Sequence, residues 1–255
     1  MILLGDDLGT AHIASRFGIR HIPNVQRNEY GTPLVNSLFA QAEAAAAYSV
    51  MGYANADIML RTNILDAVER TREVKWPALL IGRRWDIDVA ELWDFDTPDS
   101  DECLRRHLEK YGKPHDRHAM DYFIFPRGLW REIPPMAIGR TLWDNWLVWK
   151  AHASKIPIID VSAVVSAIHQ NHDYSHANGA RRGAWHGPEA ERNFALLGGF
   201  DRIFDLRDAT WQLTPEGLFP IRTLPSVVRR FTHAAAVRPL VRPMQQFKRL
   251  MQGAS

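Results

Sequence analysis

The chain has 255 residues, of which 46% are hydrophobic and 24% are charged; this composition is typical of one globular domain, with or without an appendage, and excludes wholesale disorder. With 31 basic and 29 acidic residues, the net charge of +2 is too small to indicate nucleic acid as a general partner. The single cysteine, Cys103, excludes a disulfide within the chain. We find no apolar run of about 18 residues and no signal peptide, so we expect a cytoplasmic protein.

Apolar runs alternate with helical segments along the first two thirds of the chain. Strands are expected at residues 1–4, 19–25, 53–60, 77–82, 122–125 and 157–168. Helices are expected at residues 11–17, 33–48, 63–74, 105–111 and 140–152, and the acidic segment 86–102 is expected to be a loop or a short helix. Thr32 is the expected N-cap of the second helix, with Pro33 as its first residue. This alternation predicts an α/β fold with a mostly parallel mixed sheet.

The pattern weakens after His169, where only a hairpin or edge piece within residues 200–213 is expected. From Gly217 onward the chain has no acidic residue and seven Arg or Lys. We therefore predict a domain over 1–215 and a basic, partly helical tail over 216–255. Apolar residues at helical spacing within 243–251 favour either peripheral contact with an anionic membrane or a helix packed on the domain.

The first candidate site lies in residues 53–60, where small residues and a carboxylate interrupt an apolar strand. An unpaired buried carboxylate is costly, and Mg²⁺ or Mn²⁺ would compensate it, because both ions bind through carboxylates and substrate phosphates. Asn55 and Asp57 are separated by one residue, so on an extended chain both side chains point to one face. The alternative is that Asp57 caps a helix or belongs to a turn.

Arg83 and Arg84 form the second candidate, at the end of the strand expected at 77–82. Two guanidinium groups at a strand end are suited to clamping a phosphate or a carboxylate. The alternative is ordinary ion pairing with the acidic segment 86–102 beside them.

Asp144 is the third candidate, in the first turn of the helix expected at 140–152. A negative charge is stabilised there by the helix dipole, which is compatible with a purely structural role. If this end of the helix faces a cleft, Asp144 is a candidate general base. The neighbouring Trp143 is one of nine tryptophans, a content typical either of a Trp-rich core or of grooves for sugar-like ligands.

A cluster of three histidines and one aspartate follows the last expected strand: His169, His172, Asp173 and His176. In α/β proteins, ligand sites tend to lie just after the strands. Because no cysteine is near and no His-Glu-x-x-His helix is present, a mixed oxygen and imidazole metal site is favoured over a zinc site.

The order of these segments resembles the GT-A glycosyltransferases, in particular bacterial proteins related to the family-two enzymes. The resemblance spans about two thirds of the chain, residues 6–176. It is carried by eight segments: Asp6-Asp7, His21-Ile22-Pro23, residues 28–33, Asn55-Ala56-Asp57-Ile58, residues 82–86, Asp121-Tyr122-Phe123, Trp143-Asp144-Asn145 and residues 169–176.

The resemblance implies a GT-A-like three-layer fold and a metal-dependent transfer of a sugar, with inversion, from a nucleotide-diphosphate donor to an acceptor hydroxyl. It implies Asn55, Asp57 and His169 or His172 at a Mn²⁺ or Mg²⁺ site, the first acid of the family's D-x-D motif being replaced by Asn55. Asp144 would be the base. The residues implied in substrate binding are Asp6, Asp7, Arg83, Arg84, Asp121 and Trp143.

One departure from the family concerns the N-terminus. The family's first strand and its nucleotide-binding loop are not recognised, and Met1 falls where the second strand would begin. Two alternative functions therefore stay open: an inactive module that binds a glycan or a partner protein, and a metal-dependent hydrolase that uses the histidines of 169–176. The acceptor of an active transferase would be a glycan or a lipid-linked molecule.

Overall fold

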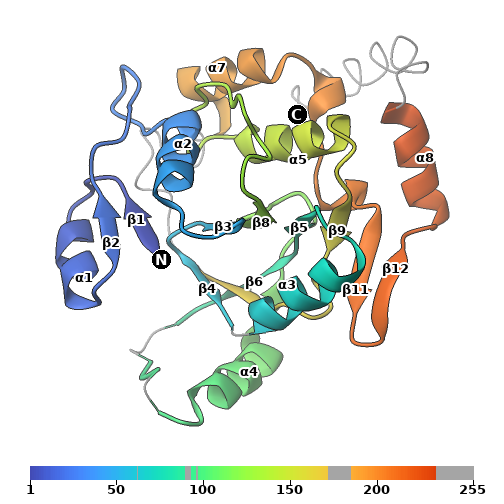
Figure 1. Cartoon of the computed structure of the whole chain (residues 1–255), viewed down its shortest axis with the longest axis horizontal. Coiled ribbons are helices and arrows are strands. Elements are labelled where there is room, and N and C mark those ends of the chain that lie inside the picture. Colours follow the sequence, from blue (N-terminus) through green and yellow to red (C-terminus); the bar gives the residue numbers. More distant parts are fainter. Residues whose placement is uncertain (62, 90–92, 96, 172–184, 234–255) are drawn as a thin grey trace.

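The computed structural model describes residues 1–61, 63–89, 93–95, 97–171 and 185–233. It confirms the predicted α/β fold (Figure 1). The chain forms a six-stranded sheet, a four-stranded sheet and a pair of N-terminal strands.

The six-stranded sheet has the order β12-β11-β9-β5-β8-β3. Its strands are β3 (Val50–Ala54), β5 (Leu79–Ile81), β8 (Tyr122–Pro126), β9 (Ile158–Asp160), β11 (Trp211–Thr214) and β12 (Gly217–Pro220). Parallel pairing is limited to β11–β9–β5, whereas β8, β3 and β12 pair antiparallel with their neighbours. The sheet is therefore mixed, as predicted, but antiparallel pairs make up more of it than the sequence pattern indicated.

Helices cover both faces of this sheet and give it three layers. Helices α2 (Val35–Ala45) and α5 (Trp143–Ala153) lie on one face, and α3 (Asn63–Val74) lies on the other (Figure 1). Alternation along the strands divides the core accordingly. Beneath α2 and α5 the buried residues include Leu79, Ile81, Phe123, Phe125 and Ile158. On the α3 side they include Leu80, Tyr122, Ile124 and Ile159.

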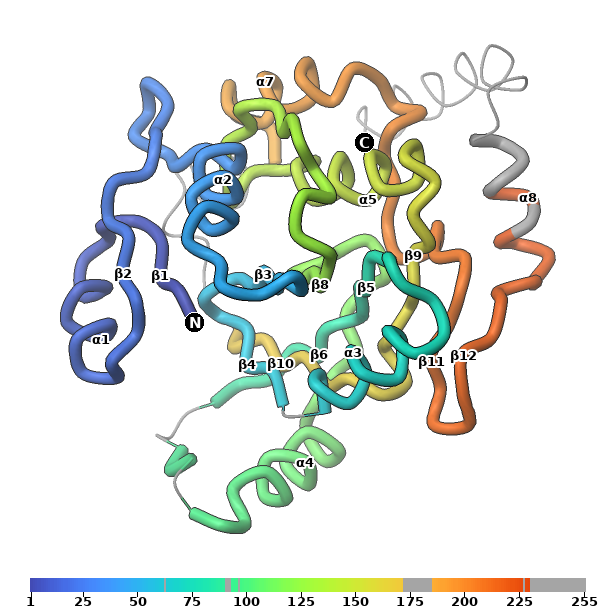
Figure 2. The backbone as a smooth tube through the Cα atoms, viewed as in Figure 1, coloured from blue at the N-terminus to red at the C-terminus, as the bar shows by residue number. Residues whose placement is uncertain are grey.

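The four-stranded sheet, of order β4-β10-β6-β7, takes β4 and β10 from the segments predicted as the longer strands 53–60 and 157–168, whereas β6 and β7 were not predicted as strands. Its members are β4 (Ile58–Leu60), β6 (Arg84–Ile87), β7 (Lys113–Pro114) and β10 (Ala167–Gln170), with α4 (Ser100–Tyr111) packed against it. The expected strands 53–60 and 157–168 were each wrong in one respect, because each is split between the two sheets. Figure 2 follows the tube from β3 through a bend into β4.

At the N-terminus, β1 (Ile2–Leu4), α1 (Thr10–Arg16) and β2 (Arg20–Ile22) form a parallel strand–helix–strand unit. The next helix, α2, starts later than predicted. Thr32 is not its cap; the N-cap residue is Leu34, which has extended backbone and makes no side-chain cap. The amide of Val35 instead donates to the carbonyl of Met136, 2.9 Å away, so a distant segment satisfies a helix end that would otherwise need a local cap.

The C-terminal part contains more regular structure than the sequence indicated. Helix α7 (Pro188–Leu197) and the short 3₁₀ turns Phe200–Arg202 and Leu206–Asp208 were not predicted. The β11–β12 hairpin spans the expected boundary between 215 and 216, so residues 217–220 belong to the large sheet rather than to a tail.

Beyond that hairpin the described chain ends with helix α8 (Leu224–His233). Arg229 on this helix is paired with the buried carboxylates of Asp205 and Asp208, at 3.2 and 2.6 Å. This contact holds α8 on the domain. The segment 243–251 lies outside the described residues, and within them no helix is both long and apolar enough to cross a membrane.

Candidate functional site

Polar side chains gather where the large sheet meets the small one. Strand β3 ends at Ala54, and the chain turns through Asn55, Ala56 and Asp57 before β4 begins. The amide of Ile58 donates to the carbonyl of Asn55 at 3.1 Å, which closes the turn. The extended conformation predicted for Asn55 and Asp57 was therefore wrong. The alternative interpretation of Asp57 as a turn residue is the one that the structure shows.

Asn55 bridges two neighbouring side chains. Its carbonyl oxygen accepts a hydrogen bond from the Tyr53 hydroxyl at 2.6 Å, and its amide nitrogen donates to Asp121 at 2.9 Å. The Asn55 backbone amide also donates to the Asp121 carbonyl at 2.9 Å. Because both ends of the Asn55 side chain are engaged, its observed role is to position Asp121 rather than to face a metal ion.

Arg84 pairs with two carboxylates at once. Its guanidinium lies 2.9 Å from Asp121 and 3.0 Å from Asp86, and its side chain is only 11% exposed. Arg83 diverges from it, because its side chain donates to the carbonyl of His115 and its amide donates to Ser162 at 2.8 Å. Of the two predicted phosphate-binding arginines, only Arg84 thus reaches the gathered carboxylates.

His169 lies between two carboxylates. Its Nε2 is 3.3 Å from Asp57, and its Nδ1 is 3.2 Å from Asp86. Sheet register produces this arrangement, since His169 on β10 is the direct partner of Asp86 on β6 and of Ile58 on β4. His115 contacts the other oxygen of Asp86. His172, the other predicted histidine ligand, lies outside the described residues.

We call the following set the junction cluster: Asn55, Asp57, Arg84, Asp86, Asp121 and His169. Asp121 is 7% exposed, and burial raises the pKa of its carboxyl group. Its Oδ2 atom is buried and has no hydrogen-bond partner among the described residues. A buried carboxylate oxygen of this kind is costly to leave unpaired.

Asp144 lies in the first turn of α5, where its carboxyl group is influenced by the charge of Asp121 in the junction cluster. Burial raises the pKa of its carboxyl group to about 7, and the nearby charge of Asp121 adds to the shift. The pKa of the buried Tyr53 hydroxyl is likewise raised, first by burial and then by Asp121, Asp57 and Asp144. The charges of these three carboxylates therefore all act on the Tyr53 hydroxyl.

The remaining predicted substrate residues lie elsewhere. Trp143 is 5% exposed and belongs to the core, where its ring packs edge-on against Tyr53 with centroids 5.4 Å apart. Asp6 and Asp7 are exposed in the N-terminal unit and pair with Arg27. Among the described residues, no hydrogen bond or ion pair joins either of them to the junction cluster.

The chain matches no protein-family model and no curated protein. The function has to be inferred from the geometry of the site.

Two residues at this site are not among the candidates predicted from the sequence. They are Asp86, a member of the junction cluster, and Tyr53, whose hydroxyl donates to Asn55. Asp86 belongs both to the Gly-Arg-Arg-Trp-Asp segment and to the acidic stretch 86–102, and Tyr53 begins an expected strand, so the sequence marks neither as a site residue. Asp86 faces His169 only because the two strands pair in that register. No local pattern carries that information.

A divalent cation is chemically compatible with the junction cluster. Carboxylate oxygens of Asp57 and Asp121 with an imidazole of His169 are donors that Mn²⁺ accepts, and the unpartnered Asp121 Oδ2 is one suitable ligand. Within the described ranges no group of three or more His, Cys, Asp or Glu side chains has the spacing of a complete metal site. Mg²⁺ commonly needs only one or two carboxylates when substrate phosphates supply further oxygens.

Proposed function

We propose that the chain transfers a sugar from a nucleotide-diphosphate donor to an acceptor hydroxyl, with Asp144 as the general base. The proposal is supported by the place of Asp144 in the first turn of α5, where burial raises the pKa of its carboxyl group to about 7 and the charge of Asp121 in the junction cluster adds to the shift. A general base works best when its pKa lies near the operating pH. A carboxylate with the ordinary pKa of 3.8 would be a weaker base than Asp144 by about three orders of magnitude.

The charges of the junction cluster support a cationic co-ligand. Asp57, Asp86 and Asp121 are acidic, and Arg84 supplies one permanent positive charge against them. A Mn²⁺ or Mg²⁺ ion would be held by the carboxylates of Asp57 and Asp121 together with phosphate oxygens of the donor, and when bound it would stabilise the negative charge of the leaving diphosphate. The protein itself contributes the fixed position of Asp121, through Asn55 and Arg84, and the orientation of His169, through Asp86.

Exclusion of water would follow from the aromatic wall behind the site. Tyr53, Phe123 and Trp143 pack against one another, with ring centroids 5.4 to 6.2 Å apart. Burial of the Asp144 carboxyl group in this part of the core is the first cause of its raised pKa. The base would therefore accept the acceptor's proton at neutral pH and hold it away from bulk solvent.

A non-catalytic module that binds a glycan or a partner protein is the second candidate function. It is favoured by one observation, the engagement of both ends of the Asn55 side chain within the protein. An aspartate at this position, as in the D-x-D motif, would bring a further carboxylate to the cation.

Calorimetry with uridine and guanosine diphosphates in the presence of Mn²⁺ tests the transferase proposal. We expect binding that requires the metal and falls by about 100-fold or more in Asp57→Ala, because one of few charged ligands is lost. Asp66→Ala is the matched control, since Asp66 lies exposed on α3 and pairs with Arg70, four residues away. If no nucleotide diphosphate bound the wild-type chain, the transferase proposal would be wrong and the non-catalytic binding module would be the remaining candidate function.

A further inference from the structure

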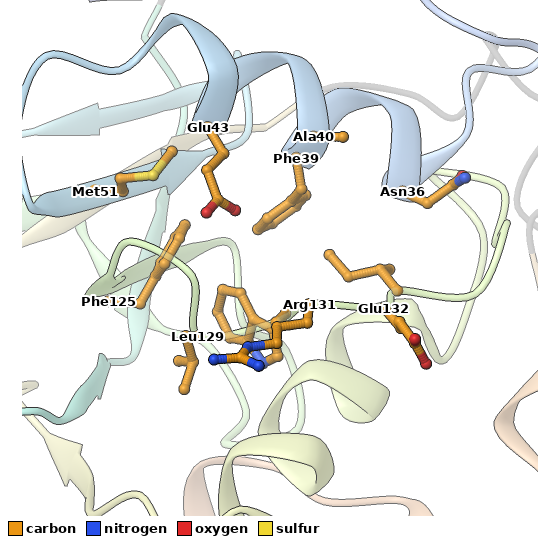
Figure 3. Close-up of a pocket in the computed structure, with 11 residues that line it drawn as sticks. Asn36, Phe39, Ala40, Glu43, Met51, Phe125, Leu129, Arg131 and Glu132 are labelled. Carbon is orange, nitrogen blue, oxygen red and sulfur yellow. The ribbon is translucent and has the colours of Figure 1, made fainter.

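A cavity lies under α2, and none of its lining residues belongs to the junction cluster. It has a volume of about 240 Å³ and is enclosed by α2, β3, the end of β8 and the segment 129–133 (Figure 3). Ligand cavities for drug-sized molecules span roughly 300–1,000 Å³. A space of this size suits a single ring or a short alkyl chain with one polar group.

Three aromatic rings form the floor of the cavity. Phe39, Phe125 and Trp130 pack with centroids 5.8, 5.5 and 4.4 Å apart, and each ring is less than 10% exposed. Because the three rings support one another, the floor keeps its shape without a ligand. The faces of such rings carry partial negative charge and attract cations.

A carboxylate faces this aromatic floor. Figure 3 shows the carboxyl group of Glu43 directed into the space between Phe39 and Phe125. Glu43 is half-buried, and its side chain makes no hydrogen bond or ion pair with any described residue. At the mouth of the cavity lie Arg131 and Glu132, both exposed, so the lining carries two carboxylates and one guanidinium. The charge of the lining is therefore net negative.

We propose that this cavity binds a small organic ammonium ion, with its apolar part on the three rings and its charged nitrogen beside Glu43. The rings and the carboxylate select the same ligand, because both attract a cation and the rings also take up apolar surface. An anionic ligand of the same shape would place a second negative charge against Glu43. This inference is independent of the proposed function, since no residue of the cavity belongs to the junction cluster.

Two ligands of equal size and opposite charge test the proposal on the full chain. We expect 2-phenylethylammonium to bind at millimolar or lower concentration, to change the fluorescence of Trp130, and to shift amide resonances of α2 and of residues 129–133. Its affinity should exceed that of 3-phenylpropionate by about tenfold or more, because of the ion pair and the cation–π contacts.

Glu43→Gln keeps the shape of the cavity and removes the charge. We expect the variant to bind 2-phenylethylammonium about five- to tenfold more weakly and the neutral 2-phenylethanol with unchanged affinity. Glu69→Gln, at an exposed position of α3, is the control and should bind as the wild type does. Equal affinities for amine and carboxylate, no loss in Glu43→Gln, or no resonance shifts up to high millimolar amine would each overturn the proposal.

Discussion

The junction cluster and the cavity under α2 differ in how their charges are satisfied, although one aromatic stack joins them. Phe39 in the floor of the cavity stacks on Tyr53 at 5.4 Å, and the Tyr53 hydroxyl donates to Asn55 in the junction cluster. At the junction Asp86 and Asp121 share the guanidinium of Arg84, and Asp57 contacts His169, whereas the Glu43 side chain in the cavity makes no hydrogen bond or ion pair with any described residue.

This contrast separates two ways of preparing a site. The junction cluster is held by sheet register and by ion pairs, so its side chains are oriented before any ligand arrives. The cavity is shaped by apolar packing. The negative charge of the half-buried Glu43 carboxylate is available to pair with a cationic ligand. The first arrangement favours precise chemistry, and the second favours simple binding.

Replacement of the proposed base has the largest expected effect on the junction side of the comparison. Asp144→Asn should lower kcat for sugar transfer by about 10²- to 10⁴-fold, because a positioned base contributes that much. The dissociation constant for the nucleotide diphosphate should stay within about threefold of the wild-type value. Steady-state kinetics with the nucleotide sugar that binds best would check this, with Asp66→Asn as control. An undiminished kcat would exclude Asp144 as the base.

The same substitution should stabilise the protein at high pH. The folded-state pKa of Asp144, about 7, is raised above its ordinary value of 3.8, so ionisation of this group opposes folding. The penalty is absent below pH 4, grows between pH 4 and 7, and is complete above pH 7. Asp144→Asn should therefore raise the free energy of unfolding at pH 8 by up to about 4 kcal/mol and leave it nearly unchanged at pH 4. Urea denaturation at the two pH values measures this difference.

A matched pair of substitutions compares the two regions directly. Arg84→Met leaves the carboxylates of Asp86 and Asp121 without their guanidinium partner, which should cost about 3–5 kcal/mol at pH 8. The loss should shrink toward pH 5, because burial raises the pKa of the Asp121 carboxyl group and this group then takes up a proton.

Phe39→Ala in the cavity floor should cost a similar 3–5 kcal/mol through lost burial and an enlarged void. That loss should not vary between pH 5 and pH 8, because no titrating group loses its partner. Chemical denaturation of both variants at both pH values checks the pair. If the two losses followed the same pH dependence, the division into an ionic and an apolar region would be wrong.

The smallest effect is expected for Asn55→Asp. The new carboxylate would replace the amide that donates to Asp121, so the metal-free protein should lose about 1–3 kcal/mol at pH 8. Mn²⁺ should restore part of that loss, since it would bring a positive charge between the two acids. Thermal unfolding with and without Mn²⁺ measures the restoration. A variant equally destabilised in both conditions would show that no cation binds beside position 55.

Local sequence patterns were sufficient for much of the fold. The apolar runs at 79–81 and 122–125 form strands, and the segments 63–74 and 143–152 form helices, because their propensity and periodicity depend on near neighbours. The same patterns failed at 53–60 and 157–168. An apolar run shows that a segment is buried but not which of two sheets receives it.

The sequence by itself determined the α/β class, most of the strands and helices, and the presence of Asp144 in the first turn of a helix. Only the tertiary structure decided that Asn55 holds Asp121, that His169 lies opposite Asp86, and that three rings from separate segments form a cavity facing Glu43. The physical reason is the separation along the sequence over which each interaction acts. Propensity and periodicity act between residues a few positions apart, whereas Asp86 and His169 are 83 positions apart and meet through strand pairing. Burial, which raises the pKa of Asp144, is likewise a property of the assembled core.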